Sequence, residues 1–221
     1  MGRSLRWGLW AGPAYVVAIL VGNGLSSAGG SGKTDAAHDL ADLQRPQSFA
    51  NHLGLSLEIL GFVALFFFLA AFYRVQRRAE GPDGWLALTA YGAGIAGLAV
   101  KVGSAAPLAA ALYRKHDIDA TTARTLIDIN GGAFVVDGLL VAVFVLAAGL
   151  SFRVSGMMSG GFVWPAVVVG VVGLVTPIVG IQNMDHYAPI PFLLCLVWIL
   201  VVGAVLAVRA GRETPAATAG S

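Results

Sequence analysis

Three ionisable side chains stand within stretches of the sequence that are otherwise apolar, and they are Glu58, Lys101 and Asp137. A carboxyl group and an ammonium group held away from water can pair, exchange a proton, or serve as acid and base toward a small substrate. Charged groups in apolar segments are costly and usually face a protein interior or an aqueous cavity. These three residues are therefore the first candidates for a functional site.

Other polar residues accompany the three. Asn130 and Asp137 are seven residues apart and share one face if their segment is a helix. We therefore predict one polar cluster within the apolar segments, made of Glu58, Lys101, Asp128, Asn130 and Asp137. A second polar set lies near the ends of other segments and comprises Asn23, Gln182, Asn183, Asp185 and His186.

The segments that carry these residues are long enough to cross a membrane. Of the 221 residues, 57% are hydrophobic and 12% are charged, whereas about a quarter of a soluble domain is charged. Apolar stretches of about 20 residues recur, and each can cross the roughly 30 Å hydrocarbon layer as a helix. They cover residues 7–25, 53–73, 85–106, 126–150, 162–181 and 190–208. The sequence thus predicts an all-α bundle of about six transmembrane helices, with residues 1–213 as a single domain.

Basic residues are concentrated at the termini and at the even-numbered connections between spans. The positive-inside rule then predicts that both termini are cytoplasmic, in a multi-pass protein of the inner or plasma membrane. Residues 26–51 become a long extracytoplasmic loop, and residues 214–221 a flexible cytoplasmic tail. Arg3 and Arg6 before an apolar run also fit a secretory signal. That run is long for a signal and contains Pro13, so we expect it to stay as a span.

The stretch GGSGKT at residues 29–34 looks like a phosphate-binding loop. Such a loop also needs an earlier glycine, at the position of Ser27, and a strand before it, where this sequence has an apolar span. We therefore expect no nucleotide binding. Residues 35–46 instead predict a short outer helix that is capped by Asp35 and stopped by Pro46, with Leu40 and Leu43 turned toward the bundle.

The sequence gives no sign of a metal or a cofactor. Its four histidines are predicted to lie in outer connections, and no two of them have the i, i+4 spacing of a strong metal signature. The net charge of +2 is explained by membrane topology and indicates no nucleic-acid partner. The expected partners are the lipid bilayer and either another membrane protein or a small molecule.

Four stretches carry a resemblance to other proteins: WAGPAYVVAILVGNG, LGLSLEILGFVALFFFLAAFYRVQRRAEG, AYGAGIAGLAV and SGMMSGGFVWPAVVVG. Together they resemble small six-span integral membrane proteins of actinobacteria that are grouped as domains of unknown function. The resemblance covers nearly the whole chain and implies a bacterial inner-membrane setting. It brings no catalytic residues with it.

Three classes of function remain open. The first is a non-enzymatic bundle that binds a small molecule or lipid or accompanies a membrane complex, and it is favoured because no complete reactive constellation is present. The second is a small transporter or a proton or ion pathway that uses Glu58, Lys101 and Asp137. The third is a membrane-embedded enzyme with Glu58 or Asp137 as acid or base. A purely structural pairing of Lys101 with one of these acids competes with the last two.

Overall fold

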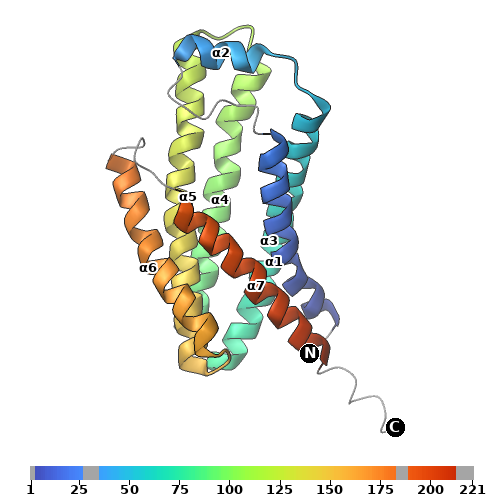
Figure 1. The fold of residues 1–221 in the computed structure, drawn as a ribbon, viewed down its shortest axis with the longest axis vertical. Helices are drawn as coiled ribbons and strands as arrows, with labels where there is room; N and C mark the ends of the chain where they lie inside the picture. Colours follow the sequence, from blue (N-terminus) through green and yellow to red (C-terminus); the bar gives the residue numbers. More distant parts are fainter. Residues whose placement is uncertain (1–2, 27–34, 183–188, 213–221) are drawn as a thin grey trace.

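The computed structural model describes residues 3–26, 35–182 and 189–212, and its regular elements in that part of the chain are helices (Figure 1). All of these except α2 are long and apolar enough to cross a membrane, which makes six candidate spans and confirms the predicted all-α membrane fold. The helices are α1 (Arg3–Ser26), α2 (Ala36–Gln44), α3 (Phe49–Glu80), α4 (Trp85–Tyr113), α5 (Ala120–Ser155), α6 (Gly160–Gln182) and α7 (Ile190–Arg212).

The spans pack mostly against their neighbours in sequence. α3 lies antiparallel along α1, α4 and α5 form a hairpin, α6 packs on α5, and α7 crosses obliquely back to α1 (Figure 1). One end of the bundle is covered by α2 and is called the α2 end below. At the opposite, arginine-rich end α1 begins and α3, α5 and α7 finish, with basic residues in the last turn of each of these three.

Aromatic side chains fill the core between the polar centre described below and the arginine-rich end. The Phe72 ring lies 5.6 Å from Phe144, 5.8 Å from Phe152 and 6.4 Å from Trp198, measured between centroids. The Trp198 indole N–H donates to the backbone carbonyl of Phe162 at 3.1 Å. These rings are buried, and together with this hydrogen bond they join helices α3, α5, α6 and α7 in one cluster.

Helices α4 and α5 extend past their apolar runs at the α2 end. The predicted spans stopped at residue 106 and restarted at residue 126, whereas α4 continues to Tyr113 and α5 begins at Ala120. Two local causes account for the difference. The Asp119 side chain accepts the Thr122 backbone N–H at 2.8 Å and caps α5. In addition, Leu43 of α2 packs with Ala111 and Ala123 in a small apolar core.

The short helix predicted in the first long connection is confirmed as α2. Asp35 caps it by accepting the His38 backbone N–H at 2.7 Å, and the helix ends before Pro46. Leu43 is buried and Leu40 is partly buried against the ends of α4 and α5, as predicted. The GGSGKT stretch and the predicted tail at residues 214–221 lie outside the described residues.

Candidate functional site

Asp137 lies in the interior of the bundle, on the face of α5 that packs against α4. Its side chain is 5% exposed, and one carboxylate oxygen lies against Gly97 of α4. Lys101, one helical turn beyond Gly97, lines the same small cavity as that carboxylate. These two residues of the predicted polar cluster thus lie on one cavity.

A small cavity joins these two residues to Tyr15 of α1. Its volume is about 20 Å³, and its polar side chains are Tyr15, Lys101 and Asp137 among apolar walls such as Phe144 and Leu98. A space of this size holds one water molecule, and the three polar groups are enough to bind it. Tyr15 was not predicted, because a tyrosine within an apolar stretch gives no periodic signal that sets it apart.

The Lys101 ammonium group lies over an aromatic ring. Its ammonium group lies 5.5 Å from the centroid of the Phe134 ring, and Phe134 in turn packs edge-on against Phe192 at 5.0 Å. The attraction between a cation and the face of an aromatic ring is stronger when the pair is shielded from water. Within the described part of the chain, no direct ion pair joins Lys101 to Asp137, although both side chains line the same water-sized cavity.

Asn130 continues the same polar seam toward the α2 end. The hydroxyl group of Ser104 on α4 donates toward Asn130 Oδ1 at 3.1 Å and toward the Lys101 carbonyl at 2.8 Å. Ser104 is buried and was not predicted, because a serine among small residues on a glycine-rich helix resembles a packing residue. Asn130, Lys101 and Asp137 thus line one α4/α5 interface.

Glu58 lies apart from this centre. It accepts a hydrogen bond from the Ser26 hydroxyl at 2.9 Å, near the close approach of Gly22 and Gly54, and so joins the end of α1 to α3. The residues that line the Asp137 cavity do not include it. Counting residues gives the position of Glu58 along its helix. The sequence does not show which other helices α3 packs against, so it could not show which side chains Glu58 meets.

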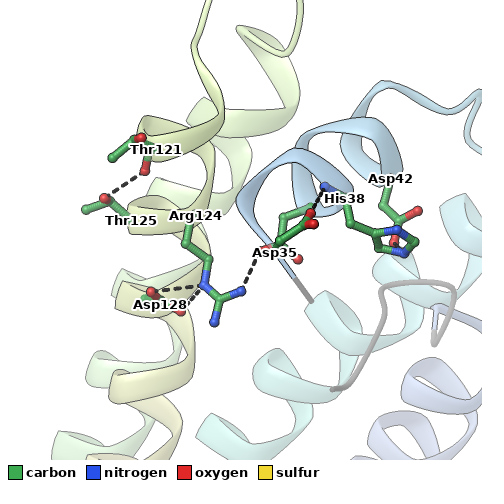
Figure 2. A network of polar contacts seen from close by, with 8 residues as sticks. Asp35, His38, Asp42, Thr121, Arg124, Thr125 and Asp128 are labelled. Carbon is green, nitrogen blue, oxygen red and sulfur yellow. Dashed lines mark hydrogen bonds and ion pairs between the residues drawn. The ribbon is translucent and has the colours of Figure 1, made fainter. Parts of the chain in front are cut away.

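Asp128 also lies apart from the centre, on the exposed side of α5. It pairs with Arg124 one turn before it at 3.2 Å, and Arg124 reaches across to Asp39 of α2 at 2.8 Å. Figure 2 shows the Arg124 guanidinium between Asp128 on its own helix and α2. Asp128 therefore belongs to an arrangement that fastens α2 onto the bundle.

The second predicted polar set is only partly described. The Asn23 side chain donates to the Ile19 carbonyl of its own helix at 2.9 Å, which is a local contact. Gln182 is the last residue of α6, and its side chain lies outside the described part. Asn183, Asp185 and His186 also lie outside the described residues.

A larger pocket lies beneath α2, between this helix and α3, α4 and α5. Its volume is about 450 Å³. One wall is polar and includes Asp42, Arg45 and Asn51, while the opposite wall is apolar and includes Leu108 and Leu112. The sequence showed the amphipathic pattern of α2 but not the pocket, because a pocket depends on how far the helix stands off the bundle.

The charges around this pocket are already paired. Asp42 Oδ1 lies 3.0 Å from the Arg45 guanidinium, and Asp42 Oδ2 lies 3.4 Å from the His38 imidazole. Asp39, which also lines the pocket, is paired with Arg124. Asn130 belongs to the pocket lining too, so the pocket and the polar seam that leads to Asp137 meet at this residue.

Two further buried polar groups lie near the arginine-rich end and were not predicted. Gln76 is fully buried and donates to the Ala148 carbonyl at 3.3 Å, while Ser151 is fully buried one turn further along α5. Gln76 Oε1 and Ser151 Oγ have no hydrogen-bond partner among the described residues. The stretch YRVQRR reads as a solvated basic segment, which is why Gln76 was missed.

Comparisons with protein-family models, with curated proteins and with solved structures found no match. The polytopic helical membrane fold is established by the six candidate spans. The polar residues described above gather in two regions, namely the small cavity at Asp137 and the pocket beneath α2.

Proposed function

We propose that this chain is a non-enzymatic membrane protein that binds a small amphiphilic molecule in the pocket beneath α2. The size of that pocket carries the proposal. Its volume of about 450 Å³ lies within the range of roughly 300 to 1,000 Å³ that is typical of small-molecule sites. The cavity at Asp137, at about 20 Å³, has room only for water.

The pocket walls indicate the kind of molecule. Leu55, Leu108 and Leu112 offer an apolar surface, and Gln47 and Asn51 offer amide groups opposite. Both lining aspartates already have arginine partners, so a charged ligand would have to compete with existing ion pairs. A ligand with an apolar body and a neutral or zwitterionic head group fits this lining best.

The setting follows from the arginine distribution and from the resemblance to six-span bacterial membrane proteins. Lipid surrounds the spans, and the proposed location is the plasma membrane with the α2 end outside. A molecule would then reach the pocket from the outer water or from the outer leaflet. Helix α2, fastened by Arg124 to α5, forms its cover.

Native mass spectrometry of protein extracted in mild detergent tests the proposal. The wild-type chain should carry a small-molecule adduct, and Leu108→Trp should lose it, because Leu108 lines the pocket and a larger ring fills it. Leu88→Trp is the matched control, since Leu88 is 58% exposed on the same helix and lies outside the pocket. An adduct that persists in Leu108→Trp would contradict the proposed site.

Proton transfer is a second candidate function, and the cavity that joins Asp137, Lys101 and Tyr15 favours it. A carboxylate beside a bound water can take up and release a proton within the membrane. Proteoliposomes with a trapped pH-sensitive dye provide the test. Proton flux above that of protein-free vesicles should occur and should be lost in Asp137→Asn, whereas flux equal to the protein-free rate would exclude this candidate.

A further inference from the structure

A long groove runs along the α1/α3 pair, away from the pocket beneath α2 and from the centre at Asp137. Its volume is about 850 Å³. Small side chains such as Ala14 and Ala70 form its floor, because α1 and α3 pack so closely that a methyl group on Gly8 would lie 2.6 Å from the Ala71 side chain. The large side chains Trp7 and Phe67 stand beside it, 74% and 62% exposed.

The length of this groove matches one leaflet of a bilayer. Along α1 it extends from Ser4 to Ala14, a distance of about 15 Å at the helical rise. Along α3 it extends from Leu60 to Arg74, a distance of about 21 Å. Half of the hydrocarbon layer is about 15 Å thick. The groove is therefore long enough to take one acyl chain of one leaflet.

One end of the groove is charged and the rest is apolar. Arg74 is exposed and lies at the arginine-rich end, opposite Ser4 of α1. A second depression shares Trp10 and Ala14 with the groove and continues it along α1 to Val21, and its lining contains no basic side chain. An arginine guanidinium binds a phosphate group with two parallel hydrogen bonds.

We propose that this groove is a binding site for one anionic phospholipid of the leaflet at the arginine-rich end. One acyl chain lies between Trp7 and Phe67 on the small-residue floor, and the phosphate and its anionic head group lie at Arg74. The site is separate from the proposed pocket beneath α2, because the two share no lining residue.

The test is lipid retention by native mass spectrometry of the full chain, released from nanodiscs that contain equal amounts of phosphatidylglycerol and phosphatidylcholine with identical chains. The wild type should retain phosphatidylglycerol in preference. Arg74→Ala should lower that preference about fivefold, the factor that corresponds to one basic residue at a membrane surface. Arg78→Ala is the charge-matched control, because Arg78 is exposed on the same helix outside the groove and should keep the preference.

Ala70→Leu fills the groove floor one turn from Arg74 without a change of charge, and it should reduce retention of both lipids. Equal retention of the two lipids by the wild type would overturn the proposal. Equal losses in Arg74→Ala and Arg78→Ala would also overturn it, because they would show general surface attraction only. A dimer that disappears in Ala70→Leu would assign the groove to a second copy of the chain and would exclude the lipid.

Discussion

The carboxylate of Asp137 on α5 lies against the backbone of Gly97 on α4, so that a methyl group on Gly97 would meet Oδ1 at 2.8 Å. This contact is what allows a buried carboxylate to approach α4 and Lys101. The absence of a side chain at position 97 therefore determines the geometry of the polar centre.

Replacement of Gly97 by alanine should displace the Asp137 side chain. We expect Gly97→Ala to be less stable than a matched alanine variant by about 1 to 3 kcal/mol, the usual cost of overpacking. Gly92→Ala is that variant, because an added methyl group there meets nothing within 4 Å. Thermal unfolding in one detergent compares the two. Equal stability of the two variants would mean that Asp137 does not need this approach.

The helices could be predicted from the sequence, but the way in which they pack against one another could not. The spans followed from the continuous apolar runs, and α2 followed from Asp35, Pro46 and an amphipathic pattern. Neighbours across the bundle could not be predicted in this way. Helices in lipid are apolar on every side, so no hydrophobic face marks the interior. Glu58 was therefore grouped with Lys101 and Asp137, although it lies at the α1/α3 interface.

The ion pair between Arg124 and Asp39 should hold α2 on the bundle. Arg124→Gln should make the backbone amides of α2 exchange about fivefold faster, since a partly exposed ion pair contributes on the order of 1 kcal/mol. Hydrogen exchange followed by mass spectrometry measures this rate. Arg114→Gln, a change at an exposed arginine after α4, serves as the control. Unchanged exchange in Arg124→Gln would show that this ion pair does not retain α2.

The cap of α5 should depend on pH. The backbone N–H of Thr122 donates to Asp119 and lowers the pKa of that carboxyl below its ordinary value of 3.8. A lowered pKa in the folded state stabilises the fold at pH above 3.8, and this contribution is lost as pH falls through the folded pKa. An NMR titration of the Asp119 carboxyl carbon should have its midpoint below 3.8. A midpoint at or above that value would contradict the cap.

The orientation of the chain in the membrane can be tested with introduced cysteines. The sole native cysteine, Cys195, is 1% exposed and gives little background. In intact cells, an impermeant maleimide should label Thr121→Cys at the α2 end. It should label Asp83→Cys, in the turn between α3 and α4, only after permeabilisation. The reverse pattern would place the α2 end in the cytoplasm.

The most direct test of the proposed function is the melting temperature of delipidated protein after the co-purified molecule is added back. A ligand that binds only the folded protein, and is present at a concentration of 100 times its Kd, stabilises the folded state by about 2.7 kcal/mol. The melting temperature of the wild type should therefore rise by several degrees. In Leu108→Trp it should not rise, because the pocket beneath α2 is filled. An equal rise in both proteins, or no rise in the wild type, would contradict the pocket as the binding site.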